Sequence, residues 1–270
     1  MNNKYKNAFD KINNGDQSGA YEEFSRILNE NPDDLFATFY RALIGFSSVP
    51  EEIEQTLKDF EKVAQSKSEF QIPAISYLAI LYSNFEEPNK AIEYGEKALK
   101  LGTELELDIN FSLSKAYFQL GDASNLKKSL LYINKCIEEE PEEISDFYIC
   151  KVDILANMNL YDEALDVLSI IYSKFGSSFT YYYLNARLSI LMYRAKENKD
   201  DLANAKRAIE TSLQYEENNF SAKMLLVEIL SLEKSKDEAL KVLETIKDSF
   251  DEDIYLVEQF KIYEESGLYE

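Results

Sequence analysis

The chain has 270 residues, of which 45% are hydrophobic and 13% aromatic, so it has ample apolar side chains for a folded core and is not a disordered segment. Its formal net charge of -21 repels phosphate backbones and anionic lipid surfaces, which excludes nucleic acid and membranes as expected partners. Histidine is absent, which removes the commonest general base and metal ligand, so we expect neither an enzyme nor a cofactor or metal site.

Residues 1–16 contain no apolar signal region, and no later apolar run reaches the length of a membrane span. We therefore expect a cytoplasmic protein. The two cysteines, Cys136 and Cys150, each fall in a helical pattern, so we interpret them as reduced core residues rather than as a disulfide. The acidity has two open interpretations: it keeps the chain soluble, or it steers a basic partner toward it.

A pattern of one small residue followed at i+4 and i+7 by apolar or small residues recurs along the chain. Its template is Ala91, Gly95 and Ala98. The leading residues recur about 34 to 41 positions apart, which is the interval of a helical repeat array. The other members of the pattern are Ala20/Phe24/Ile27, Thr56/Phe60/Val63, Ser129/Ile133/Cys136, Ala164/Leu168/Ile171, Ala205/Ile209/Ser212 and Ala239/Leu243/Ile246.

Each of these small-residue helices follows another amphipathic helix, so the unit is a helical hairpin in which small side chains let two backbones approach. We expect an all-α fold and one continuous array over residues 1–270. The seven expected hairpins are approximately 1–34, 35–67, 70–103, 105–141, 143–176, 178–217 and 219–250.

A last helix is expected over residues 251–266. Leu256, Phe260 and Tyr263 lie along one stripe of it, and we interpret it as the first helix of an eighth hairpin. The final residues, 266–270, are similar to the start of the second helix at 159–163. We therefore expect the array to be truncated at its C-terminus, with the native protein continuing beyond Glu270.

Hairpins of this length resemble tetratricopeptide repeats, and the resemblance covers nearly the whole chain. A tryptophan typical of the first helix is missing, and residues 47–50 and 123–125 are expected to lengthen two turns. The resemblance implies a right-handed superhelical α-solenoid whose first helices line the concave side. The resemblance to tetratricopeptide repeats rests on Gly-Asp turns at Gly15-Asp16 and Gly121-Asp122, on helix-closing prolines at Pro32 and Pro141, and on the helix opening Leu160–Leu165.

The concave side of the expected solenoid forms a groove. Residues offset from the packing face of the first helices are expected to point into this groove. They can bind a partner, or the aromatic ones can pack between neighbouring first helices; both interpretations stay open. Phe111 and Phe118 favour binding, because Leu113 and Tyr117 already supply the packing face of their helix. The candidate partner-binding residues are Phe39, Leu43, Phe46, Phe111, Lys115, Phe118, Tyr183 and Arg187.

The resemblance implies a non-catalytic protein-interaction scaffold that binds a peptide or protein segment in its concave groove. The alternative is a signalling receptor that senses a short peptide and changes its superhelical pitch, which small-angle scattering with added peptide would detect. The carboxylate clamp of some family members is not expected, since Tyr5, Phe9, Tyr40, Pro73 and Tyr77 occupy its places. The sequence makes no prediction of oligomeric state.

Overall fold

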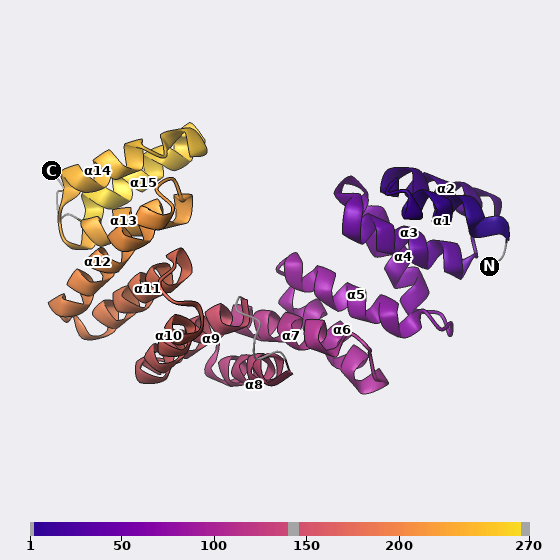
Figure 1. Cartoon of the computed structure of the whole chain (residues 1–270), viewed down its shortest axis with the longest axis horizontal. Helices are drawn as coiled ribbons and strands as arrows, with labels where there is room; N and C mark the ends of the chain where they lie inside the picture. Colours follow the sequence, from indigo (N-terminus) through magenta and orange to yellow (C-terminus); the bar gives the residue numbers. More distant parts are fainter. Residues whose placement is uncertain (1–2, 140–145, 266–270) are drawn as a thin grey trace. The chain divides into compact units, whose positions relative to one another are not determined.

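The computed structural model describes residues 3–139 and 146–265, and these contain fifteen α-helices, three short 3-10 helices and no strand (Figure 1). The expected all-α array of helical hairpins is therefore confirmed. The α-helices are α1 Lys6–Asn13, α2 Gln17–Glu30, α3 Leu35–Ser48, α4 Ile53–Ala64, α5 Gln71–Asn84, α6 Pro88–Leu101, α7 Glu106–Leu120, α8 Ala123–Glu139, α9 Asp146–Asn157, α10 Tyr161–Phe175, α11 Phe179–Lys196, α12 Lys199–Tyr215, α13 Phe220–Leu232, α14 Lys236–Glu244 and α15 Glu252–Glu265.

Contacts divide the chain into two compact units, Met1–Glu140 and Pro141–Glu270. In the first unit α1/α2, α3/α4, α5/α6 and α7/α8 form hairpins, and α2, α4 and α6 also pack on the next first helix. In the second unit α9/α10, α11/α12 and α13/α14 do the same, and α15 packs on both α13 and α14. The first helices α9, α11, α13 and α15 also contact one another in succession, so they share one face of this unit.

A left-handed residue closes the first helix of most hairpins. Gly15 and Gly121 take φ of +79° and +71°, a backbone region that glycine enters at least cost. The aspartate that follows then caps the second helix: Asp16 accepts a bond from the Gly19 N–H at 2.9 Å. In four of the remaining five hairpins the left-handed turn residue is not glycine, and it is Glu86, Asn159, Glu197 or Lys234.

The turn at Gly121 differs from its expected length. Asp122 accepts bonds from the backbone N–H groups of Ser124 and Asn125, at 2.9 and 3.1 Å. This cap lets α8 begin at Ala123, so the expectation that residues 123–125 lengthen the turn is wrong. Around the other expected insertion, the 3-10 helix Pro50–Glu52 lies between α3 and α4.

Small residues bring the helices together as their spacing predicts. Ala91 and Ala98 of α6 are fully buried, and a Cβ placed on Gly95 would lie 2.8 Å from the Leu113 Cδ2 of α7. Gly95 thus allows α6 to approach the first helix of the next hairpin, not only its own partner α5. The core around them is aromatic as well as aliphatic, because Phe60 is fully buried between the ring of Tyr77 at 5.2 Å and that of Phe39 at 6.1 Å.

Two consecutive junctions of the first unit share one polar arrangement. The Tyr82 hydroxyl of α5 donates to Glu61 of α4, and its ring stacks on Tyr94 at 5.6 Å. The Tyr117 hydroxyl of α7 donates to Glu96 of α6, and its ring stacks on Tyr132 at 5.8 Å. A lysine lies over each buried ring, Lys90 at 4.6 Å and Lys128 at 4.7 Å. Tyr82 therefore joins α4 to α5, and Tyr117 joins α6 to α7.

These tyrosines make the first unit sensitive to alkali. Burial, and then the bond to a carboxylate, raises the pKa of both Tyr82 and Tyr117. Because only the neutral phenol donates, their contribution is complete below the unfolded pKa of about 10 and is lost as the pH rises from there toward the folded pKa. We expect urea-unfolding free energies to fall above about pH 10, and to fall less steeply in a Tyr82→Phe/Tyr117→Phe variant. Equal slopes for the two proteins would contradict this assignment.

The last helix packs through a face other than its longest apolar stripe. Tyr255 and Ile262 are buried against the α13/α14 hairpin, whereas Leu256, Phe260 and Tyr263 are exposed. The apolar pattern thus covers more than one side of α15. The expected helix closure at Pro141 lies outside the described residues. The expected truncation depends on residues 266–270, which also lie outside them.

Candidate binding site

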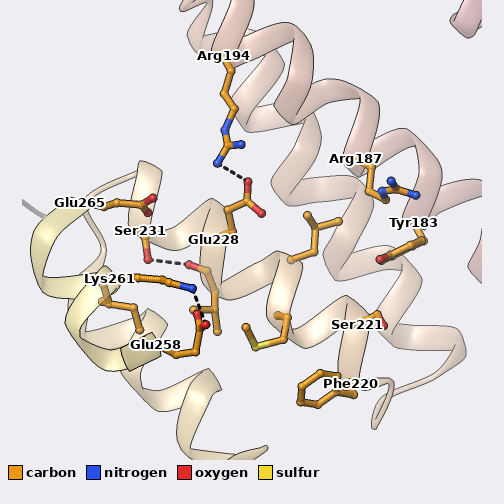
Figure 2. A pocket seen from close by; sticks show the side chains of 14 residues that line it. Tyr183, Arg187, Arg194, Phe220, Ser221, Glu228, Ser231, Glu258, Lys261 and Glu265 are labelled. Atoms are coloured by element: carbon orange, nitrogen blue, oxygen red, sulfur yellow. Dashed lines mark hydrogen bonds and ion pairs between the residues drawn. The ribbon is translucent and has the colours of Figure 1, made fainter. Parts of the chain in front are cut away.

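The shared face of the first helices in the second unit carries a pocket of about 540 Å³. Figure 2 shows side chains from α11, α13 and α15 converging on it. Its volume lies within the range of small-ligand and peptide side-chain sites. The lining residues are Tyr183, Arg187, Arg194, Phe220, Ser221, Met224, Leu225, Val227, Glu228, Ser231, Glu258, Lys261, Ile262 and Glu265.

One part of the lining is apolar. Phe220 begins α13 and is 41% exposed, and Met224 follows one helical turn later on the same side. The Phe220 ring packs against that of Phe250, at 5.3 Å between centroids. A thioether next to a supported aromatic ring is an adaptable apolar surface for a ligand side chain.

Another part of the lining is charged, and its charges are paired. Arg194 of α11 contacts Glu228 of α13 at 2.9 Å, and Lys261 contacts Glu258 within α15 at 2.6 Å (Figure 2). Both cationic side chains are more than half exposed, so water screens these pairs and a ligand group can exchange for either partner. The pocket therefore combines apolar contact with accessible charges of both signs.

Arg187 links the pocket to the preceding hairpin. Its guanidinium pairs with Asp153 of α9 at 3.1 Å and lies 5.9 Å from the centre of the Tyr183 ring. Burial raises the pKa of the Asp153 carboxyl, and the Arg187 charge opposes that rise. The Tyr183 ring is also stacked on Phe179 at 5.5 Å. These contacts hold Tyr183 and Arg187 in fixed positions at the pocket wall.

The sequence-derived candidates in the first unit divide between core and surface. Phe39 is 7% exposed, and its ring stacks on Phe70 at 4.8 Å. Phe46 is half-buried, with its ring 5.2 Å from Tyr77. Phe39 and Leu43 line one side of a second pocket, of about 450 Å³, whose other side is formed by α5 and the α6–α7 loop. The α3 aromatics therefore pack between neighbouring helices, and only part of their surface faces a cavity.

The candidates on α7 are half-buried. The Lys115 ammonium lies 5.7 Å from the centre of the Phe111 ring and donates to Asn84 of α5 at 3.3 Å. Phe118 lies one turn further along the same helix. The three side chains thus share one side of α7, and Lys115 is anchored to the preceding first helix.

Several lining residues were not candidates in the sequence. Arg194 belongs to the last turn of α11, which at 18 residues is longer than the other first helices among the described residues, and Lys261 and Ile262 belong to α15. A stripe read at i, i+4 and i+7 from Tyr183 ends before Arg194. Extending the stripe by one more turn would have reached it.

Neither a cluster of metal-binding side chains nor a candidate membrane-spanning helix occurs among residues 3–139 and 146–265. In these ranges no three cysteine, aspartate or glutamate side chains lie close enough together to hold a metal ion. Within the same residues, no helix is both long and apolar enough to cross a membrane.

No protein-family model matches the sequence, and no curated protein matches it. Solved structures do match its fold. A tetratricopeptide repeat protein from Parabacteroides merdae shares 15% identity at a TM-score of 0.72, with 96% of each chain covered. PilF of Pseudomonas aeruginosa shares 13% identity at a TM-score of 0.58, covering 83% of this chain and 96% of PilF. YrrB, described as a tetratricopeptide repeat protein with an unusual peptide-binding site, shares 21% identity at a TM-score of 0.55, covering 74% of this chain and 95% of YrrB.

Proposed function

From the tetratricopeptide-repeat fold of this chain, we propose that it is a non-catalytic protein-interaction scaffold that binds an extended segment of a partner protein. The pocket on α11, α13 and α15 is the observation that carries the proposal. In this function Phe220 and Met224 receive an apolar side chain of the partner. Arg194 and Glu228, which line the same pocket, exchange their mutual contact for polar groups of the bound backbone.

One similarity and one expectation from the sequence support this proposal. YrrB, which shares the fold, is described as having a peptide-binding site. Residues of the present pocket were also expected from the sequence to face the groove, namely Tyr183 and Arg187. The sites on the first unit belong to the same proposal as secondary contacts, with Leu43 and Phe39 in one cavity and Phe111, Lys115 and Phe118 on α7.

The test is a screen of the full chain against a random library of linear twelve-residue peptides, followed by calorimetric titration of the enriched peptides. Met224→Glu places a carboxylate in the apolar part of the pocket, and we expect it to weaken binding by about tenfold or more. The matched control is Leu131→Glu, which adds the same charge at a side chain of α8 that is 56% exposed and lies outside the pocket.

The result that would overturn the proposal is equal loss of binding in Met224→Glu and Leu131→Glu. A screen that enriches no sequence above background would overturn it as well. Circular dichroism of both variants checks that any loss reflects the surface rather than unfolding.

A further inference from the structure

Four tyrosines form a row across three consecutive helices of the second unit. Tyr172 ends the row on α10, Tyr181 and Tyr182 continue it on α11, and Tyr215 ends it on α12. Successive ring centroids are 5.0, 5.1 and 6.0 Å apart. Tyr172 and Tyr215, at the two ends, are 48% and 51% exposed, so the row is accessible to solvent at both ends.

A pocket of about 440 Å³ adjoins this row at Tyr182. It lies on another side of α11 from the candidate binding site, because Tyr182 lines one pocket and Tyr183 the other, and adjacent helical residues point about 100° apart. The row and this pocket are therefore a separate surface. The pocket is lined by Leu165, Tyr182, Asn185, Ser189, Met192, Asp201, Asn204, Arg207, Ala208 and Thr211.

The two asparagine side chains of this pocket can donate hydrogen bonds to a ligand, whereas the Ser189 and Thr211 hydroxyls already donate within the protein, Thr211 to the Arg207 carbonyl at 2.7 Å. Ser189 donates to the Asn185 Oδ1 at 3.3 Å, and Arg207 donates to the Asn204 Oδ1. Each amide oxygen thus has a partner within the protein, and the Asn185 and Asn204 amino groups keep their donor capacity for a ligand. Asp201 is the one carboxylate of the lining, and it is 8% exposed. The lining also contains the cation Arg207, so in a strongly acidic chain this surface has amide and guanidinium donors and little accessible negative charge.

A ligand that fits supplies acceptors to the asparagine amides and flat apolar surface to the tyrosine rings. Proline-rich segments have these properties, because proline lacks an N–H group and the polyproline II helix leaves its carbonyl oxygens without internal partners. The polyproline II helix rises about 3.1 Å per residue, so one ring spacing of the row corresponds to roughly two residues of such a ligand. Aromatic-lined grooves with polar donors are a recurring recognition mode for this conformation.

We propose that the tyrosine row and its adjoining pocket bind a proline-rich, charge-poor segment of a partner protein in the polyproline II conformation. Proline rings pack against Tyr172, Tyr182 and Tyr215, and Asn185 and Asn204 donate to carbonyl oxygens of the segment. This site is independent of the pocket on α11, α13 and α15.

The test is a calorimetric titration of the full chain with an N-acetylated, C-amidated decaproline peptide. A Gly-Ser decapeptide with the same end groups is the ligand control. We expect saturable binding of decaproline alone, weakened at least about fivefold by Tyr215→Ala and by Asn204→Asp, which removes the amide donor and keeps the side-chain shape. Phe85→Ala, which removes an aromatic side chain 41% exposed in the first unit, should bind normally. Met224→Glu should also bind normally, which separates this proposal from the proposed function.

Three outcomes would overturn the inference: no saturable heat with decaproline, equal binding of the Gly-Ser peptide, or unchanged affinity in both the Tyr215 and the Asn204 variants. Tyr215 is half exposed and ends its helix, so its removal leaves the core intact, and Asn204→Asp is a second variant that does not depend on aromatic packing.

Discussion

Replacing Asp59 with alanine is expected to destabilise the first unit by about 3–5 kcal/mol, because a buried cation then loses its counter-ion. Asp59 of α4 accepts two bonds from Arg41 of α3, from Nε at 2.7 Å and from Nη2 at 2.8 Å. The two side chains are 6% and 15% exposed. Gln55 donates to the same carboxylate at 2.8 Å, and the Tyr21 ring lies 5.9 Å from the guanidinium carbon. The pair thus joins three helices.

The measurement is urea denaturation followed by circular dichroism. Glu30→Ala is the matched control, because it removes a carboxylate 2.8 Å from Arg26 in an exposed pair, where we expect a loss below about 1 kcal/mol. A double variant, Arg41→Met/Asp59→Leu, should recover much of the lost stability, since apolar side chains of similar size do not need a counter-charge. If Asp59→Ala costs no more than Glu30→Ala, the pair has no structural role.

The arrangement of hairpins was predictable because it depends on local spacing. Small residues at i, i+4 and i+7 determine which side of a helix another backbone can approach, and Gly15 with Asp16 determines where one helix ends and the next begins. These signals lie within a few residues of their effects. The start of α8 was missed for a related reason, since the Asp122 cap can begin a helix at once and sequence length alone does not show this.

The candidate site was less predictable because it depends on contacts between hairpins. Phe39 fits an outward stripe of its helix, yet Phe70, on the α4–α5 connection, covers its ring. Conversely Tyr183 and Arg187 fit the same kind of stripe and do line a pocket. Whether such a side chain is covered or lines a pocket depends on side chains about 30 or more positions away, such as Asp153 for Arg187. The pattern of one helix contains no information about those distant side chains.

In the second unit, replacing Leu168 with alanine is expected to cost about 2–5 kcal/mol, the range for a buried leucine whose site cannot fully collapse. Leu168 of α10 is 2% exposed and lies between Ala164 and Ile171 on the buried side of its helix. Since contacts divide the chain near residue 140, we expect the loss to fall on the second unit. Amide hydrogen exchange read by mass spectrometry should accelerate in α9 to α15 and remain unchanged in α1 to α8.

Asp59→Ala should give the opposite exchange pattern, which makes the two variants controls for each other. Repeat arrays transmit stability through neighbouring interfaces, so a strongly coupled array would instead show faster exchange in both units for either variant. That result would argue for one cooperative block and against two. The distinction matters for function, because the two pockets that carry the proposals are in the second unit. Leu168→Ala should weaken library peptides and decaproline together as the temperature rises. Met224→Glu and Tyr215→Ala should instead each affect one ligand at every temperature at which the chain is folded.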